Sequence, residues 1–188
     1  MFNKEKKFVF VHNPKCAGTS IKNAISEHLG LDENQHNNEN RFYRNPHLTL
    51  NQYNYYIDDD LNDYFKFIST RNPWDRMVSL HHHRVLNANH KRPFGLMCRV
   101  GQLKYLTFSN LASINGEICM DFVIKFENLQ EDFDKAMKKI GVNNPPKLKK
   151  FDHGNNRRKD YRSCYTKETK EMIGDMFAEE IKRFNYKF

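Results

Sequence analysis

Apolar residues along the chain are grouped in an order that predicts a strand, a turn and a helix, and this order recurs. Residues 8–12 form a compact aromatic and β-branched run that stops at an Asn-Pro pair, and apolar residues at helical spacing follow from Thr19. The same order leads from residues 64–70, through Asn72 and Pro73, into a second predicted helix. The chain therefore begins with two strand-turn-helix units.

A third unit and a closing helix complete the pattern. Residues 122–126 are a short apolar run, and helical spacing then continues from Leu129 to Gly141, a typical helix stop. A last helix is predicted after Thr166, its N-cap, with an apolar stripe that is expected to pack on the sheet. Strands alternating with helices predict a three-layer, P-loop-like α/β domain in which helices flank a central parallel β-sheet. The stripe comprises Met172, Ile173, Met176, Phe177, Ile181 and Phe184.

The carboxyl ends of the parallel strands are where ligands bind in such a domain, and both Asn-Pro turns fall at this edge. Residues 30–63 and 91–121 show a less regular pattern of apolar positions. We expect these two segments to be loops that shape the site of a second substrate.

Composition narrows the classes of partner without choosing among them. No Gly/Ser/Pro-rich linker divides the 188 residues, so residues 1–188 are interpreted as one domain. The net charge of +8 and the pI of about 9.3 favour an anionic partner: nucleic acid, acidic lipid, acidic polysaccharide or a phosphorylated cofactor. The N-terminal apolar run is too short for a signal peptide or a membrane span, so a soluble cytoplasmic protein without a membrane anchor is expected.

Metal and disulfide chemistry receive little support from the sequence. The four cysteines are scattered and include no CxxC pair, so neither a zinc site nor a disulfide framework is indicated. The run of three histidines at residues 81–83 is predicted to be helical, and consecutive helical residues point about 100° apart, too far to converge on one ion. We expect no metal site.

The first turn has the composition of an anion cradle. Lys15 lies in the turn, and Gly18, Thr19 and Ser20 stand where the helix begins, so backbone N–H groups, a helix dipole, hydroxyl donors and a mobile cation come together. A Walker A loop would place the lysine directly after the glycine, whereas Lys15 precedes Gly18, which disfavours a nucleoside triphosphatase. An ordinary βα turn, in which Gly18 relieves crowding and a hydroxyl caps the helix, stays open at this point.

The second turn offers a second anion site. Arg71 stands at the end of a strand and Ser79 follows two helical turns later, which suits a phosphate held by a guanidinium and a hydroxyl. Two phosphate sites together indicate a bisphosphorylated nucleotide. We refer to residues 13–20 as the Lys15 turn and to residues 71–79 as the Arg71 turn.

Residues 14–20, Pro-Lys-Cys-Ala-Gly-Thr-Ser, and residues 71–79, Arg-Asn-Pro-Trp-Asp-Arg-Met-Val-Ser, resemble the two cofactor signatures of the sulfotransferase superfamily, in particular of its carbohydrate-type branch. The resemblance extends to residues 47–49, to residues 126–129 and to the tail from residue 166. It implies 3′-phosphoadenosine 5′-phosphosulfate (PAPS) as the sulfuryl donor, without a metal. The residues implied for the 5′-phosphosulfate are Lys15, Cys16, Ala17, Gly18, Thr19 and Ser20, and those for the 3′-phosphate are Arg71, Ser79 and, from a late basic segment, Arg157.

Two residues are candidates for catalysis. Lys15 would neutralise the bridging oxygen as the S–O bond breaks, because a flexible point charge can follow developing charge. His47 would accept the proton of the acceptor hydroxyl, since a histidine near its usual pKa of about 6.5 can take up a proton at neutral pH. An Asp or Glu from a neighbouring loop is the competing base. We expect Trp74 to be a packing residue of the core, and stacking on the adenine is the alternative.

The expected acceptor is a hydroxyl on a glycan, and the basic surplus would suit an anionic one. A phenol, a lipid or the hydroxyl of a small metabolite stays open as the acceptor. Since no membrane anchor is visible, the chain is similar to the soluble bacterial or viral members of the branch, and we expect neither a membrane anchor nor nucleic acid as a partner. Two other classes stay open. A non-enzymatic module that binds nucleic acid or another polyanion would explain the charge but neither turn. A P-loop kinase of a small molecule is disfavoured by the position of Lys15 and the lack of a clear magnesium-binding carboxylate.

Overall fold

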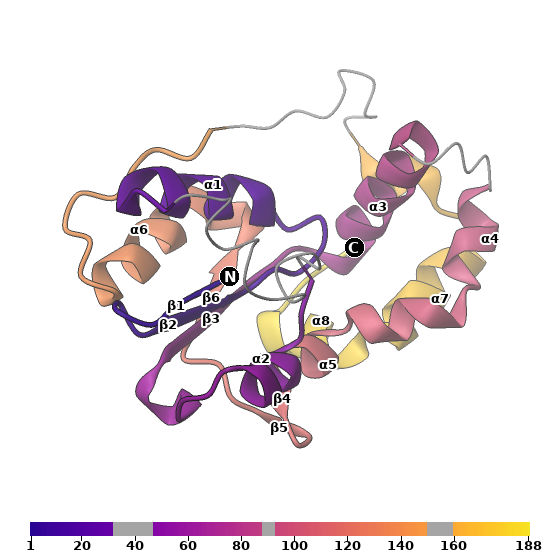
Figure 1. The fold of residues 1–188 in the computed structure, drawn as a ribbon. Coiled ribbons are helices and arrows are strands. Elements are labelled where there is room, and N and C mark those ends of the chain that lie inside the picture. Colours follow the sequence, from indigo (N-terminus) through magenta and orange to yellow (C-terminus); the bar gives the residue numbers. More distant parts are fainter. Residues whose placement is uncertain (32–46, 88–92, 150–159) are drawn as a thin grey trace.

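The structure is a computed structural model that describes residues 1–31, 47–87, 93–149 and 160–188 (Figure 1). The strands are β1 Phe2–Asn3, β2 Phe8–Val11, β3 Phe65–Thr70, β4 Ser113–Ile114, β5 Glu117–Ile118 and β6 Phe122–Lys125. The α-helices are α1 Gly18–Leu29, α2 Leu50–Tyr56, α3 Pro73–Asn87, α4 Phe94–Cys98, α5 Phe108–Ala112, α6 Leu129–Lys139, α7 Lys167–Met176 and α8 Ala178–Phe184. Short 3₁₀ turns are η2 Leu61–Asp63, η3 Gly101–Leu106, η4 Phe126–Asn128 and η5 Tyr161–Cys164.

The central sheet has the strand order β1-β2-β3-β6. The three strands predicted from the sequence, β2, β3 and β6, are parallel, with Phe10 opposite Phe67 and Phe67 opposite Phe122. β1 is a short edge strand that runs antiparallel to β2, so the sheet is mostly parallel and not wholly so. The predicted α/β class is confirmed. Within the central sheet, the sequence pattern missed β1, a strand of two residues that is too short to show periodicity.

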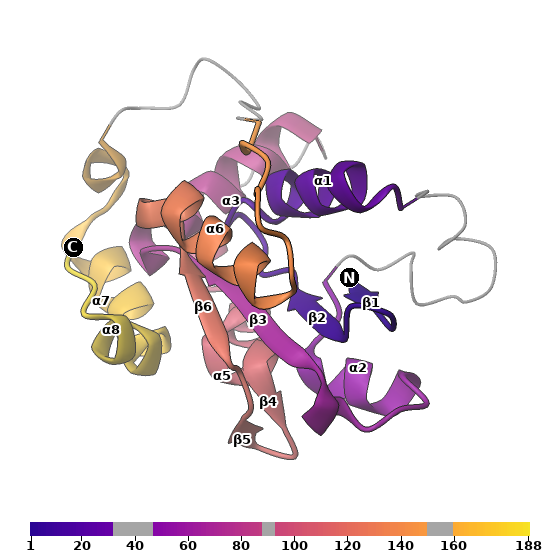
Figure 2. The same cartoon turned by 90° about the vertical axis from the view of Figure 1, so that its left-hand side faces the viewer.

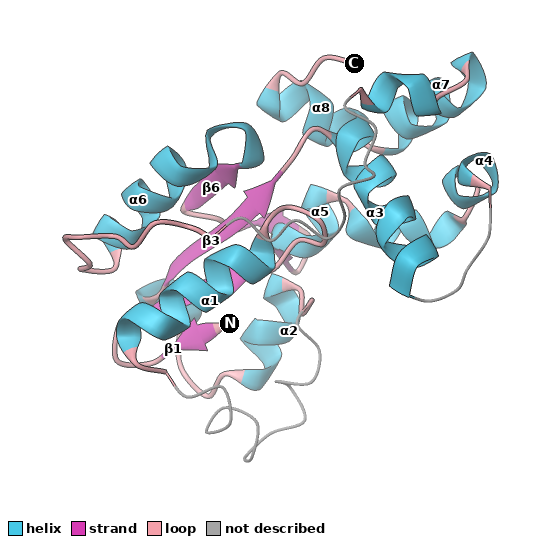
Figure 3. Cartoon of the chain, turned by 90° about the horizontal axis from the view of Figure 1, so that it is seen from above, coloured by secondary structure: helices cyan, strands magenta, loops and turns pink. Residues whose placement is uncertain are grey.

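Helices cover both faces of the sheet. On one face lie α1 and α6 (Figures 1 and 3). These helices bury the side chains of Phe8, Phe10 and Phe67. On the other face lie α2 and α5 (Figure 2), and Val9 and its neighbours form a second apolar cluster with them. Successive residues of a strand point to opposite faces, which explains why Val9 and Phe10 belong to different clusters. A strand that is buried on both faces reads as a continuous apolar run, as β2 does.

The closing helical segment departs from the prediction in two ways. It is divided into α7 and α8 at Phe177, whose backbone leaves the helical region (φ −111°, ψ 22°). Ile173 and Phe177 are buried in a third cluster with Trp74 and Met77 of α3, so this part of the stripe packs on helices and not on the sheet. The predicted N-cap is confirmed, because the Thr166 hydroxyl accepts a hydrogen bond from the Thr169 N–H.

The two segments expected to be loops contain regular structure within their described parts. Residues 47–63 hold α2 and η2, and residues 93–121 hold α4, η3, α5 and the β4-β5 hairpin. α2 begins with a capping box between Thr49 and Gln52 that the irregular apolar pattern did not reveal. The prediction of loops was therefore wrong for these elements, which are too short to give a periodic signal.

Candidate anion-binding site

The carboxyl ends of β2 and β3 bring the Lys15 turn and the Arg71 turn together. β2 and β3 are neighbours in the sheet and run in the same direction, so the residues that follow Val11 and Thr70 emerge at the same edge. A hydrogen bond joins the two turns directly, since Nη1 of Arg71 lies 3.1 Å from the carbonyl oxygen of Lys15. The sequence-based prediction that both turns lie at this edge is confirmed.

The backbone of the Lys15 turn is strained. Lys15 and Ala17 both adopt left-handed conformations, with φ of 64° and 62°. A left-handed conformation costs a residue with a side chain about 1–2 kcal/mol, and such strain concentrates at functional sites. The charge-assisted hydrogen bond from Arg71 to the Lys15 carbonyl contributes about 1.5–3 kcal/mol, enough to offset the strain at one of the two residues.

The N-terminus of α1 is left open by its N-cap residue, because Ala17 makes no side-chain cap hydrogen bond. The N–H groups of Gly18, Thr19 and Ser20 lie in the first turn of α1, where an α-helix supplies no carbonyl partner, and the helix dipole adds partial positive charge. An N-terminus without a hydroxyl cap keeps its N–H groups available, and an anion that binds at a helix N-terminus requires such groups.

Gly18 is needed for close packing as well. A Cβ atom at this position would lie 1.9 Å from Cδ2 of His12, closer than any real contact. The imidazole of His12 therefore lies directly on the backbone at the start of α1. Burial and the nearby imidazole of His47 lower the pKa of His12 from 6.5 to about 3, so this ring is neutral at physiological pH. The sequence analysis left open that Gly18 relieves crowding in an ordinary βα turn, and the contact with His12 shows that this position has no room for a side chain.

Cys16 faces inward. Its side chain is fully buried, and burial raises the pKa of the thiol to about 12, so it stays protonated. Its N–H group donates to the carbonyl oxygen of Asn13 at 3.3 Å. The Asn13 side chain is also fully buried, and neither Nδ2 nor Oδ1 has a hydrogen-bond partner among the described residues.

Arg71 contacts Asp75 and Phe126 in addition to the carbonyl oxygen of Lys15. Its Nε and Nη2 atoms lie 2.7 and 2.6 Å from Oδ2 of Asp75, and its guanidinium stacks 3.9 Å from the ring centroid of Phe126. The residue is only 3% exposed. Ser79 lies on α3 and is partly exposed, whereas Arg157 falls outside the described residues. The structure thus adds Asp75 and Phe126 to the surroundings of the Arg71 turn.

His47 lies beside the Lys15 turn. Its Nδ1 atom is 3.1 Å from the carbonyl oxygen of His12, and the two imidazole rings meet edge to face at 4.6 Å. Partial burial lowers the pKa of His47 below 6.5, the charge of Lys15 acts in the same direction, and the hydrogen bond to the His12 carbonyl raises it. The residue remains exposed, so a ligand can reach the ring.

The hydrogen bond of His47 determines its tautomer. A carbonyl oxygen only accepts hydrogen bonds, so Nδ1 of His47 carries the proton in the neutral ring and donates it to His12. Nε2 is then the acceptor atom of the ring. A neutral histidine with a defined acceptor nitrogen has the form that a general base requires.

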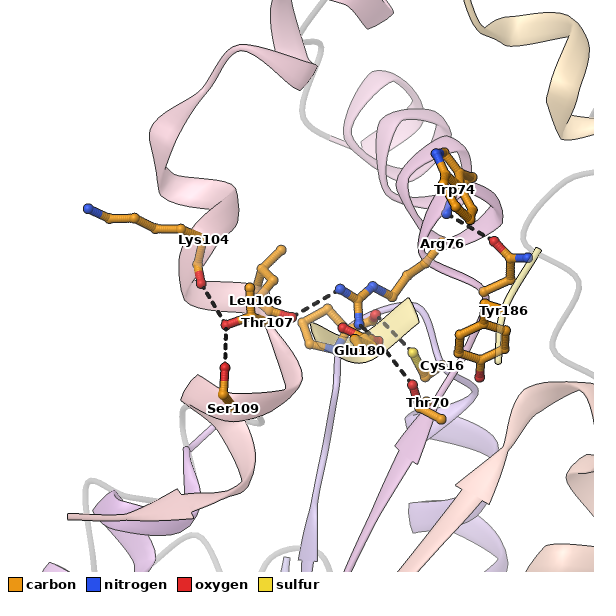
Figure 4. A network of polar contacts seen from close by, with 12 residues as sticks. Cys16, Thr70, Trp74, Arg76, Lys104, Leu106, Thr107, Ser109, Glu180 and Tyr186 are labelled. Atoms are coloured by element: carbon orange, nitrogen blue, oxygen red, sulfur yellow. Dashed lines mark hydrogen bonds and ion pairs between the residues drawn. The ribbon is translucent and has the colours of Figure 1, made fainter. Parts of the chain in front are cut away.

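A buried ion pair ties the C-terminal helices to the Arg71 turn (Figure 4). Nη1 of Arg76 lies 3.1 Å from Oε1 of Glu180, and both side chains are 1% exposed. The hydroxyl of Thr70 donates to the same carboxylate oxygen at 3.0 Å, and Nη2 of Arg76 donates to the carbonyl of Leu106. The Arg76 guanidinium also lies beside the Cys16 thiol.

This ion pair was not foreseen from the sequence, although a signal exists. Glu180 lies three residues after Phe177 and four before Phe184, so helical spacing places a carboxylate on the apolar side of its segment. Trp74 is 7% exposed and its indole donates to the Lys170 carbonyl, which confirms that it packs in the core. Within the described residues, no cluster of three His, Cys, Asp or Glu side chains could hold a metal, and no helix is long and apolar enough to cross a membrane.

Comparison with known protein families gives a match over the first part of the chain. A family model described as "Sulfotransferase family" matches residues 1–107, more than half of the chain. The matched region contains the Lys15 turn, His47 and the Arg71 turn. No curated protein and no solved structure gives a significant match.

Proposed function

Since the chain belongs to the sulfotransferase family, and is by that membership a transferase, we propose that it uses PAPS as the donor and a carbohydrate hydroxyl as the acceptor. The observation that carries this proposal is the joint position of Lys15, the open N-terminus of α1 and His47 at the end of β2. An anion site, a mobile cation and a candidate base then lie at one edge of the sheet.

The Lys15 turn fits a phosphosulfate group. The uncapped N–H groups of α1 and the strained backbone at Lys15 and Ala17 form a positively polarised end. In the part of the chain that the structure describes, the buried amide of Asn13 in the same turn has no hydrogen-bond partner. We assign Lys15, Ala17, Gly18, Thr19 and Ser20 to this group. Cys16 also belongs to the turn, although in this structure its N–H is directed to Asn13.

The 3′-phosphate is assigned to the Arg71 turn. Arg71 and Ser79 supply a guanidinium and a hydroxyl, and the bonds of Arg71 to Asp75 and to the Lys15 carbonyl hold the guanidinium between the two turns. Arg157 is assigned to the same phosphate, and this assignment rests on the family resemblance alone.

Each chemical task then has a residue. The donor supplies the sulfuryl group and a phosphate leaving group. Lys15 is placed at the phosphosulfate end of the site, where an ammonium group stabilises negative charge that develops on a leaving oxygen. His47 holds its Nδ1 proton on the His12 carbonyl and receives the proton of the acceptor hydroxyl on Nε2.

The extent of the domain and the acceptor class are part of the same proposal. The tail contacts the Arg71 turn, because the Asn72 side chain donates to the Lys187 carbonyl at 2.7 Å, which supports one domain over residues 1–188. The net charge of +8 favours an anionic saccharide over a neutral one as the acceptor.

Thermal stability with added ligands tests the donor. Adenosine 3′,5′-bisphosphate is expected to raise the melting temperature, whereas ATP with magnesium and double-stranded DNA are expected to have a smaller effect or none. Stabilisation by ATP with magnesium alone would favour a kinase, and stabilisation by DNA alone would favour a nucleic-acid-binding module. Transfer from labelled PAPS to a panel of neutral glycans, uronic acid glycans, phenols and lipids then identifies the acceptor.

A further inference from the structure

The peptide group between Lys15 and Cys16 is held at both ends. Its N–H, on Cys16, donates to the Asn13 carbonyl at 3.3 Å, and its carbonyl, on Lys15, accepts from Nη1 of Arg71 at 3.1 Å. Because a peptide group is planar, two bonds on opposite sides determine its orientation. That orientation keeps Lys15 in its left-handed conformation (φ 64°) and so determines the direction in which its side chain leaves the backbone.

Arg71 can make this bond because Asp75 orients its guanidinium. A single carboxylate oxygen of Asp75 accepts from Nε and Nη2, and the plane of the group is set by the stack on Phe126. A guanidinium is rigid, so two bonds on one edge and a stack on one face leave Nη1 one direction, towards the Lys15 carbonyl. Asp75 therefore acts on Lys15 through Arg71.

This pair differs from other ion pairs at helical spacing in the chain. The Lys135–Glu131 and Arg183–Glu179 pairs join side chains that are all more than 40% exposed. In the Arg71–Asp75 pair the side chains are 4% and 18% exposed. Exposed pairs of this kind contribute little to stability. The Arg71–Asp75 pair is buried and is bonded to the left-handed residue Lys15, so we expect it to have a positional role.

We propose that Asp75 is a positioning residue for sulfuryl transfer, which holds Arg71 so that Arg71 fixes the backbone of Lys15 and aims its ammonium group at the leaving oxygen. The proposal rests on the proposed function, because it assigns Lys15 to that oxygen. Asp75 itself contacts Arg71 and is assigned no contact with the substrate.

Two substitutions at Asp75 and one matched control test the proposal. Asp75→Asn removes the charge, and Asp75→Glu keeps it but displaces the carboxylate, so it leaves the buried guanidinium with a counterion and is the safer variant for folding. Glu131→Gln removes the carboxylate of an exposed pair as the control. The measurements are kcat with PAPS, the Kd for adenosine 3′,5′-bisphosphate and the melting temperature.

The expected result separates kcat from binding and stability. Misplacement of a catalytic group by about 1 Å costs up to about 100-fold in rate, so kcat is expected to fall about tenfold in Asp75→Glu and further in Asp75→Asn. The melting temperature of Asp75→Glu should stay close to that of the wild type. The Kd for the bisphosphate, whose 3′-phosphate is assigned to Arg71, should rise by less than kcat falls. Glu131→Gln should match the wild type in all three measurements.

Three outcomes overturn the proposal. Wild-type kcat in Asp75→Glu would show that the carboxylate position does not matter, whether or not Asp75→Asn folds. A fall in kcat that accompanies an equal loss of affinity and a lower melting temperature would assign Asp75 a purely structural role. A wild-type protein that neither transfers sulfuryl groups nor binds the bisphosphate would overturn the proposed function first, and the inference with it.

Discussion

Nδ1 of His47 lies 3.1 Å from the carbonyl oxygen of His12, the residue whose ring packs on Gly18 at the start of α1. Through His12, the candidate base is thus connected to the backbone of the anion site. Since the Nδ1 proton is committed to this carbonyl, the lone pair of the neutral ring is on Nε2.

Replacement of His47 is expected to affect turnover and not donor binding. His47→Ala should lower kcat by about 100-fold or more, the usual scale for loss of a general base, because no other described group is assigned the proton of the acceptor. The Kd for adenosine 3′,5′-bisphosphate should change little, which isothermal titration measures. Full activity in His47→Ala would instead favour a carboxylate as the base.

The pH dependence of kcat/KM provides an independent test of the same residue. The pKa of His47 is lowered from 6.5, so the neutral, basic form persists to lower pH than in an ordinary histidine. Activity should therefore be constant through neutral pH and decline only as the pH falls through the lowered pKa, below about 6.5. In His47→Ala this acid limb should disappear; an unchanged limb would assign it to another group.

Removal of the Lys15 side chain is expected to abolish measurable transfer. Lys15→Ala loses the cation that is proposed to stabilise the leaving oxygen, whereas Lys15→Arg keeps a charge with a different shape and should retain a small part of the activity. Single-turnover kinetics with saturating PAPS separate this effect from donor binding. Activity of Lys15→Ala within about tenfold of the wild type would contradict the role assigned to Lys15.

A methyl group at Gly18 should damage both folding and donor binding. The Cβ of Gly18→Ala would overlap the His12 ring, and such overpacking costs about 1–3 kcal/mol. Displacement of His12 would also move the start of α1 and the carbonyl that holds His47. Gly101→Ala is the matched control, since its Cβ would meet nothing within 4 Å. Urea unfolding and bisphosphate titration of both variants measure the difference, and equal effects would refute the argument.

Loss of the Glu180 carboxylate should destabilise the whole protein. In Glu180→Gln the buried Arg76 guanidinium loses its counterion, and an uncompensated buried charge costs about 3–5 kcal/mol. Glu179→Gln, which breaks the neighbouring exposed pair with Arg183, should be close to neutral. Urea unfolding compares the two variants. A similar midpoint for both would show that Arg76 finds another partner.

The sequence predicted the elements that carry a strong local signal. The runs in β2, β3 and β6, the Asn72-Pro73 start of α3 and the Thr166 cap all depend on residues within one turn of each other, and each is present. The placement of both Asn-Pro turns at one edge followed from the parallel sheet. The contacts of Arg71 with Lys15 and of Arg76 with Glu180 join residues that are 56 and 104 positions apart, and no local pattern encodes such a pairing.

The Arg76–Glu180 pair also links the unfolding of α8 to that of the Arg71 turn. The family match ends at residue 107, yet the counterion of Arg76 and the hydroxyl contact of Thr70 come from α8. A fragment limited to the matched region would leave a buried cation without its anion. Opening of α8 and opening of the Arg71 turn are therefore expected to be a single event in hydrogen exchange, so that a helix far along the chain shares the protection of the proposed donor site.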